Sequence, residues 1–388
     1  MQTNFTILQR LHSILSHTNI SRRLCTSHGS QLKRLVLISK SKSIFHNLAL
    51  EEWMYENKDF ADVEYLLLWK NRPTVVFGRH QNPWLEANVS LATKYGVDIS
   101  RRSSGGGTVY HDEGNLNLSF LTSRARYNRK ANLNLVVDAL TARWDLDLTV
   151  NDRDDIMLEK FYKVSGTAAK LGRVQSYHHF TLLVDVDQQK LLQCLTSVMQ
   201  GADSKATRSS PASVRNLIER APDMTFESLV EVIGQNFLHK NNEQVNSENY
   251  RWIDPVNEED YPGISEIVAR LESWQWVYGK TPAFSIFRAF VGHFNSKPCT
   301  LKISITVEKG NLTSLIMEVD RMCDDLQDLM ETMQKYYLSN LNSPSLTREN
   351  IENLQTGFEL YVLAESGSNE TVFVQWVSNS IKSCFSFL

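Results

Sequence analysis

The stretch RRSSGGGTVYHDEGNLNLSF, residues 101–120, places three consecutive glycines between a pair of arginines and an alternating run typical of a β-strand. The glycines at 105–107 can adopt positive φ and leave backbone N–H groups open to close approach by a ligand. Arg101 and Arg102 carry planar guanidinium groups that suit phosphate or carboxylate. No Gly-Lys-Ser/Thr sequence follows, which excludes a Walker phosphate loop. A strand follows where the dinucleotide-binding fingerprint needs a helix, which excludes that fingerprint. The stretch predicts a loop over an anionic ligand, with a plain hairpin and surface arginines as the alternative.

Strand and helix patterns alternate irregularly on either side of this loop. Apolar runs predict a strand at 34–39 and a hairpin of two short strands at 64–78. Further strands are predicted at 162–169 and 178–187, and helices at 44–57, 131–144, 187–200, 225–239 and 260–273. This order favours an α+β fold with a mixed sheet over a doubly wound parallel sheet.

The stretch WQWVYGKTPAFS, residues 274–285, predicts a connection between two domains, because it concentrates aromatic residues with Gly and Pro. After it, alternating runs predict two strands around a turn at 309–311, and a helix follows at 324–338. We therefore expect a catalytic domain at 32–270, followed by a linker and a small α+β accessory domain at 271–388.

The composition of the 388 residues is that of an ordinary globular protein, and it excludes several classes of function. A formal net charge of -3 argues against a protein that binds nucleic acid polymers. No apolar run approaches the ~18 residues needed to span a membrane. The five cysteines are far apart and show no CxxC spacing, which predicts free thiols and neither a disulfide framework nor a zinc site. We expect a monomer.

The N-terminal stretch has the character of a targeting sequence. The first 50 residues contain no Asp or Glu, and residues 1–31 carry three arginines among many Ser and Thr. The run FTILQRLHSIL places its apolar residues on one helical face. This pattern predicts a mitochondrial presequence at 1–31, and with it a location in the mitochondrial matrix. The alternative is a disordered or ordinary helical N-terminus.

A lysine within the predicted strand 162–169 is the second candidate for chemistry. On such a strand Lys163, Ser165 and Thr167 share one face. A lysine next to a Ser-Gly pair can place a point charge on a phosphoryl or carbonyl oxygen, although a single lysine on a strand is usually a solvated surface residue.

Two other residue types that often carry chemistry are assigned structural roles. His178 and His179 are adjacent on a predicted strand and therefore face opposite sides, with no third ligand nearby, so we predict no metal site. Cys194 lies in a predicted helix, where we expect a buried and inert thiol.

Several long motifs follow one another in a fixed order along the chain. RRSSGGGTVYHDEGN precedes KVSGTA by about 50 residues, HHFTLL comes after it, and NRPTVVFGRHQNPW at 71–84 and WQWVYGKTPAFS at 274–285 flank them. In this order the motifs resemble those of the lipoate–protein ligase family, and the resemblance covers nearly the whole chain after residue 31. It implies a catalytic domain like those of biotin– and lipoate–protein ligases, with a mixed sheet flanked by helices.

The resemblance also implies which residues form the site. Arg102 is implied to contact a nucleotide, and Lys163 to act at the acyl-phosphate junction as the catalytic residue. The stretch NDRDDIM at 151–157 is implied to lie beside the nucleotide, and TRSSPA at 207–212 to cover it, although its composition departs from the bacterial pattern. The implied binding residues are Arg102, Gly105, Gly106, Gly107, Thr108, Val109, Tyr110, Arg153, Asp154 and Thr181, with Thr207, Ser210 and Ala212 from the covering stretch.

The activity implied by the resemblance is transfer of a lipoyl group from lipoyl-AMP to a lysine ε-amine on the lipoyl domains of 2-oxoacid dehydrogenase complexes. Lipoyl-AMP is then a substrate, no tightly bound cofactor is expected, and Mg²⁺ and ATP are needed only if the chain also activates lipoate. The alternatives are a complete ATP-dependent ligase, an amidotransferase that uses the lipoylated H protein of glycine cleavage as donor, and a non-catalytic lipoate-binding module. A cysteine-dependent octanoyltransferase is disfavoured, because no cysteine lies near the two motifs.

Overall fold

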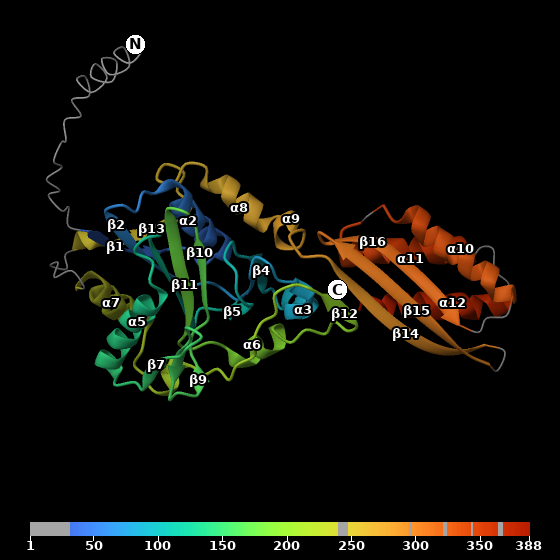
Figure 1. Cartoon of the computed structure of the whole chain (residues 1–388), viewed down its shortest axis with the longest axis horizontal. Helices are drawn as coiled ribbons and strands as arrows, with labels where there is room; N and C mark the ends of the chain where they lie inside the picture. The colour runs from blue at the N-terminus through green and yellow to red at the C-terminus, as the bar shows by residue number, and fades with distance from the viewer. Residues whose placement is uncertain (1–31, 240–246, 295–296, 321–323, 343, 364–367) are drawn as a thin grey trace, which may run out of the picture. The chain divides into compact units, whose positions relative to one another are not determined.

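The computed structural model describes residues 32–239, 247–294, 297–320, 324–342, 344–363 and 368–388 (Figure 1). The contacts divide the chain into two units, Met1–Leu32 and Lys33–Leu388. The predicted presequence at 1–31 lies outside the described residues, and the described helices and strands belong to the second unit.

The largest sheet has six strands in the order β10-β11-β6-β2-β1-β13. β1 pairs in parallel with both β2 and β13, whereas the pairs β2–β6, β6–β11 and β11–β10 are antiparallel. The six strands are β1 (Lys33–Ser39), β2 (Val63–Trp69), β6 (Asn115–Ser123), β10 (Thr167–Leu171), β11 (Gln175–Leu183) and β13 (Tyr250–Ile253). The mixed sheet confirms the predicted α+β class.

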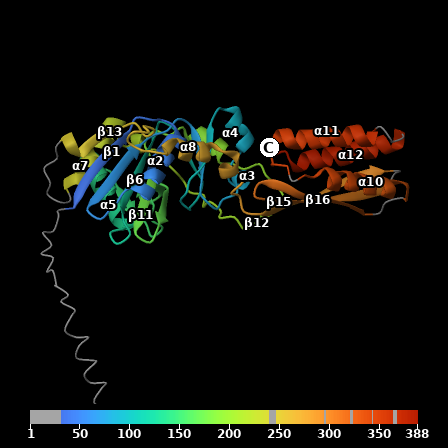
Figure 2. The same cartoon turned by 90° about the horizontal axis from the view of Figure 1, so that it is seen from above.

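Helices cover both faces of this sheet, as the alternation of side chains along its strands requires. Val36 and Ile38 of β1 share a buried apolar cluster with α5 (Arg129–Trp144) and α7 (Phe226–His239). Leu37, between them, joins a second cluster with α2 (Ile44–Asn57) and α8 (Ile264–Glu272). Because successive side chains of a strand point to opposite faces, one apolar run supplies two cores. Figure 2 shows α5 and α7 near the strands β1 and β6.

Two three-stranded sheets lie outside the six-stranded one. The first is formed by β3 (Thr74–Phe77), β4 (Asp98–Arg101) and β5 (Val109–His111), and the second by β7 (Leu148–Val150), β8 (Ile156–Leu158) and β9 (Tyr162–Lys163). The predicted hairpin at 64–78 is therefore wrong, because β2 and β3 belong to different sheets. The side chain of Asn71, which is buried in the bend between them, bonds to Asn47 and His111 instead of closing a tight turn.

The predicted strand at 162–169 is also interrupted. β9 ends at Lys163, and β10 begins at Thr167. Between them Val164 is fully buried in the apolar core, and the hydroxyl of Ser165 accepts a hydrogen bond from the backbone N–H of Ile156 at 2.7 Å. Lys163 and Thr167 therefore line the same cavity, and Ser165 does not.

The C-terminal part contains an antiparallel sheet in the order β12-β14-β15-β16. Its strands are β12 (Ala202–Ser204), β14 (Phe284–Phe294), β15 (Lys297–Glu308) and β16 (Asn311–Asp320), and its helices are α10 (Asp324–Asn340), α11 (Arg348–Leu363) and α12 (Ser368–Cys384). The predicted strand pair around 309–311 and the predicted helix at 324–338 are confirmed. β12 precedes the other three strands by about 80 residues of sequence and comes from within the predicted catalytic domain.

Short elements complete the described residues. They are α3 (Pro83–Glu86), α4 (Val89–Lys94), α6 (Gln188–Cys194), α9 (Trp274–Val277) and the 3-10 turns Leu217–Glu219 and Ser247–Asn249. The predicted helix at 187–200 is thus shorter, and Cys194 at its end is buried, as expected. Within the described residues no helix has the length and apolar character needed to cross a bilayer.

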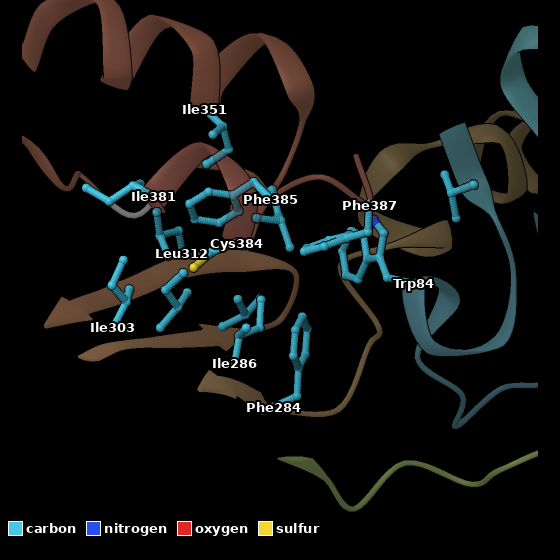
Figure 3. Close-up of a cluster of buried hydrophobic side chains, with 14 of the residues drawn as sticks. Trp84, Phe284, Ile286, Ile303, Leu312, Ile351, Ile381, Cys384, Phe385 and Phe387 are labelled. Carbon is cyan, nitrogen blue, oxygen red and sulfur yellow. The ribbon is translucent and has the colours of Figure 1, made fainter. Parts of the chain in front are cut away.

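One apolar cluster joins the C-terminal sheet and helices to the segment after β3. Trp84 of α3 stacks on Tyr278 with ring centroids 5.4 Å apart. Its indole also contacts Phe284 and Phe387 (Figure 3). All of these side chains are mostly or fully buried within a single cluster that also contains Ile286 and residues of α12. The two predicted domains thus share a hydrophobic core across the connection at 274–285.

Candidate active site

A cavity of about 310 Å³ lies beside the glycine loop. Its wall includes most of the residues that the family resemblance implied, although they come from five separate segments of the chain. These residues are Arg102, Gly106, Gly107, Thr108, Val109, Arg153, Lys163, Thr181, Thr207 and Ser210. The other wall residues were not singled out as binding residues, and they are Leu48, Trp69, Val76, His111, Asn117, Arg129, Asp155, Gly166, Thr167, Ala168, His179, Phe180, Arg208 and Ser209.

Four implied residues, among them Gly105 and Ala212, do not line the cavity. On β5 the neighbours of Tyr110 face the cavity, so Tyr110 points the other way into the apolar cluster around Trp84. Asp154 has a positive φ of 59° and forms an ion pair of 3.1 Å with Arg129. The carboxylate on the wall is the next one, Asp155.

The two arginines that precede the glycine loop bind different parts of the protein. Arg101 is fully buried and donates to the carbonyl oxygens of 78, 79, 81 and 277 and to the hydroxyl of Thr281. It does not line the cavity, so the expectation that both guanidinium groups face the ligand is wrong for Arg101. Burial lowers its pKa to about 10. Arg101 instead ties the segment after β3 to the connection at 274–285.

Arg102 lines the cavity and holds the glycine loop in shape. Its Nη2 donates to the carbonyl oxygens of Gly105 and Gly107 at 2.6 and 2.7 Å, its Nη1 to that of Val76, and its Nε to Ser104. A guanidinium has five N–H donors, so one remains for a ligand in this arrangement. Burial lowers its pKa to about 10, and no ion pair to it occurs among the described residues. A buried cation without a carboxylate partner favours an anionic ligand.

The three glycines of the loop are not equivalent. Gly106 has a φ of +87°, which favours glycine, and a Cβ there would lie 3.0 Å from Arg102 Nη2. A Cβ on Gly105 would meet nothing within 4 Å. The loop also depends on a glycine outside the motif, because a Cβ on Gly78 would lie 2.1 Å from the carbonyl oxygen of Gly106.

Lys163 is held by a carboxylate at the end of β9. Its Nζ lies 2.8 Å from Oδ1 of Asp155, which is 11% exposed, while the lysine side chain is 24% exposed and reaches the cavity. The backbone of Lys163 is fixed on the other side by its N–H bond to the carbonyl oxygen of Ser213. The ammonium group therefore has a defined position and keeps donors for a ligand. The prediction from sequence named Asp154 and not Asp155, because the two acids are adjacent just before β8 and the pattern does not separate them.

A chain of buried polar groups supports Arg102 from behind. Glu51 Oε1 lies 2.8 Å from His179 Nδ1, and His179 Nε2 lies 2.8 Å from the hydroxyl of Ser104. The same hydroxyl accepts the 3.0 Å bond from Arg102 Nε. Because a carboxylate only accepts, Nδ1 of His179 donates to Glu51, and in the neutral ring Nε2 then accepts from the hydroxyl of Ser104. The adjacent His178 faces the opposite side and stacks on Phe120, as predicted.

We expect Ser104→Ala to lower kcat/KM for transfer by about tenfold, because it leaves Arg102 Nε and His179 Nε2 unpaired at a cost of about 1–3 kcal/mol. The matched control is Ser103→Ala. Ser103 is also buried and bonds to Glu52, which keeps a partner in Arg270 at 2.8 Å. Steady-state kinetics and thermal unfolding of both variants test this. Equal losses of activity in the two variants would contradict the support role.

The segment 207–210 closes the cavity over the glycine loop. The hydroxyl of Ser209 accepts a 2.8 Å bond from the backbone N–H of Thr108 and one from Gln81. Arg208 pairs with the buried carboxylate of Glu86 at 3.2 Å. The stretch implied as a cover lies against the loop, and the contact is made by Ser209, which the resemblance did not single out. No group of residues that could hold a metal ion occurs in the described part of the chain.

The chain is similar to a known family and to several known proteins. The family model described as "Lipoyl protein ligase A/B catalytic domain" matches residues 43–238. The human protein named "Lipoyl amidotransferase LIPT1, mitochondrial" is 40% identical over 279 residues, which are 72% of this chain and 74% of the relative. The mouse protein of the same name is 39% identical over 281 residues, with the same two coverages.

Solved structures show the same fold. The Plasmodium falciparum LipL1 structure in complex with lipoate has a TM-score of 0.54 and 23% identity, and covers 90% of this chain and 99% of its own. A lipoate–protein ligase A structure with bound ATP has a TM-score of 0.50 and 21% identity, with coverages of 63% and 98%. The resemblance inferred from the motifs is confirmed, and the chain belongs to the lipoyl protein ligase A/B catalytic domain family and is an acyltransferase of that family.

Proposed function

We propose that the protein transfers a lipoyl group from lipoyl-AMP to the ε-amine of a lysine on the lipoyl domains of 2-oxoacid dehydrogenase acyltransferase subunits. The observation that carries the proposal is the composition of the cavity beside the glycine loop. Leu48, Trp69, Val76 and Phe180 from the core elements form an apolar wall, and Arg129, Arg153, Lys163 and Arg208 add cations to it. A ligand made of an apolar chain and an adenylate would pack its chain against the apolar side chains and place its phosphate near the cations.

The chemistry requires attack of the neutral acceptor amine on the acyl carbon of the mixed anhydride. Negative charge develops on the carbonyl oxygen and on the departing phosphate, so a fixed cation beside them lowers the barrier. Lys163, oriented by Asp155, supplies this cation. The site positions the two reactants and stabilises charge, and it needs no covalent enzyme intermediate.

Arg102 contributes by shaping the loop that covers the ligand. Two of its four bonds hold the carbonyl oxygens of Gly105 and Gly107 in the loop, and one of its five N–H donors is left for the ligand. Arg153 is exposed at the rim and forms no ion pair among the described residues, so it is available to the adenylate phosphate.

A second donor is favoured by the names of the relatives. The human and mouse proteins are called amidotransferases. If this chain acts likewise, the donor is a lipoyl-lysine amide, such as that of the H protein of glycine cleavage, and the acceptor and pocket are unchanged. Both relatives are also called mitochondrial, which supports the proposal that this chain works in the mitochondrial matrix.

We expect product from lipoyl-AMP, and little or none from free lipoate with ATP and Mg²⁺. A site that activates lipoate must also bind the triphosphate of ATP, with the free carboxylate of lipoate in line with the α-phosphate. Three of the cavity cations are already paired with acids: Arg129 with Asp154, Lys163 with Asp155 and Arg208 with Glu86.

The purified protein and a lipoyl domain should therefore be supplied in turn with lipoate plus ATP and Mg²⁺, lipoyl-AMP, and lipoylated H protein. The mass increment on the acceptor is the readout. A lipoyl domain whose acceptor lysine is replaced by arginine is the control. Equal turnover from the first two donors would make the protein a complete ligase, and turnover only from the third would make it an amidotransferase.

A further inference from the structure

We propose that His111 presents one fixed hydrogen-bond donor to the apolar part of the cavity, and that this donor selects an acyl chain ending in a weak acceptor over one ending in a methyl group. The dithiolane sulfurs of a lipoyl chain are such acceptors, and the sulfur-free octanoyl chain lacks them. The inference rests on the proposed function, because it concerns the chain that the cavity holds.

The imidazole of His111 is buried, yet one of its nitrogens is unpaired. The residue is 3% exposed and lies on the cavity wall. Its Nδ1 is 3.0 Å from Nδ2 of Asn71, whereas its Nε2 has no hydrogen-bond partner among the described residues. Buried polar groups without a partner are rare, and on a cavity wall a ligand atom can supply the missing bond.

The hydrogen bonds behind the ring fix where its proton lies. Asn47 Nδ2 donates to the carbonyl oxygen of Ser41 and to Oδ1 of Asn71, both at 3.0 Å, while Asn47 Oδ1 accepts from Ser39. The amide end of Asn71 therefore faces His111 and donates to Nδ1. Since Nδ1 accepts, the neutral ring carries its proton on Nε2, and the unpaired nitrogen is a donor.

The ring stays neutral at physiological pH. Burial is the main cause that lowers the pKa of His111, to about 3, and the positive charge of Arg102 contributes less. His111 therefore offers an uncharged N–H, which suits a weak acceptor better than a phosphate or a carboxylate.

His111 packs against the apolar part of the cavity wall. Its ring meets that of Trp69 edge to face, with centroids 6.2 Å apart. Lys163 is held instead by Asp155 and the backbone of Ser213. With the acyl carbon at Lys163, as the proposed function has it, we place the end of the chain against the wall that carries His111.

The functional test compares kcat/KM for lipoyl-AMP and octanoyl-AMP with one acceptor domain. His111→Phe keeps an aromatic ring and removes the donor, and should lower the lipoyl-to-octanoyl ratio about fivefold, the scale of one weak hydrogen bond. His178→Phe, which replaces a buried histidine that does not line the cavity, should leave the ratio unchanged. His111→Leu gives the same comparison if the phenylalanine variant does not fold. An unchanged ratio in a folded His111 variant would overturn the inference.

A second readout does not depend on turnover. Nitrogen NMR of histidine-labelled wild-type protein, with the His111 signals assigned by their loss in the variant, should show the neutral ring with its proton on Nε2. A ring protonated on Nδ1 would overturn the inference. Calorimetry with free lipoate and octanoate tests the His111 inference separately from the proposed function. A binding preference for lipoate that depends on His111, in a protein that shows no transfer, would contradict the proposed function and leave the inference standing.

Discussion

Lys163→Ala should leave the protein folded and lower transfer from lipoyl-AMP by about 10²-fold or more, the scale for removing one preorganised charge-stabilising donor. The lysine side chain contributes little to the core, because it is 24% exposed and contacts the cavity and Asp155. Its ammonium group, by contrast, is the fixed cation on the wall next to a carboxylate that orients it. The loss should therefore appear in kcat more than in KM.

A nearby lysine gives a matched control for this experiment. Lys170 on β10 packs over the ring of Tyr55 at 4.4 Å and does not line the cavity. Lys170→Ala should keep transfer within about twofold, since surface substitutions away from a site change little. Asp155→Asn should fall between the two, because it keeps the ammonium group and removes its anchor. Near-normal kcat in folded Lys163→Ala would refute the assigned role.

Gly106→Val should weaken lipoyl-AMP binding by about tenfold or more while the sheets remain folded. A non-glycine residue at a φ of +87° is strained by about 1–2 kcal/mol, and a β-branched one suffers more. The new Cβ would also lie 3.0 Å from Arg102 Nη2, the atom that bonds the loop carbonyls. Both effects push the loop out of the shape that covers the cavity.

Gly105→Val is the control, because an added Cβ at this position meets nothing within 4 Å. Titration calorimetry with lipoyl-AMP, or with a non-hydrolysable analogue, measures both variants. We expect the Gly105 variant to bind nearly as the wild type does. If both variants bind equally well, the loop does not cover the ligand and its glycines serve only the turn.

The parts of the site that the sequence could predict are those written in short local motifs. The glycine loop, Arg102 and Lys163 each stand in a distinctive run, and Gly106, Gly107, Arg102 and Lys163 line the cavity. The pattern could not separate Arg101 from Arg102, because adjacent arginines differ only in where the strand β4 ends. It placed Tyr110 in the site by continuity of the motif, whereas strand alternation turns it away.

The unpredicted wall results from contacts between distant segments. Trp69 and His111 come from different sheets, and their proximity depends on the bend at Asn71 that the sequence predicted as a hairpin turn. No local spacing encodes such a contact. The overall α+β class was easier to predict, because alternating apolar runs and amphipathic stretches are local properties.

The pairing of strand β12 shows that the catalytic part of this chain extends beyond the residues that line the cavity. Every residue on the cavity wall lies between Leu48 and Ser210. Yet the segment 207–210 is preceded by β12, whose pairing partner is β14, and the buried Arg101 bonds to Val277 and Thr281. A fragment that ended with the family match at residue 238 would contain all the chemistry and lose both of these restraints. The residues that line the cavity thus occupy a shorter stretch of sequence than the residues that hold them in position.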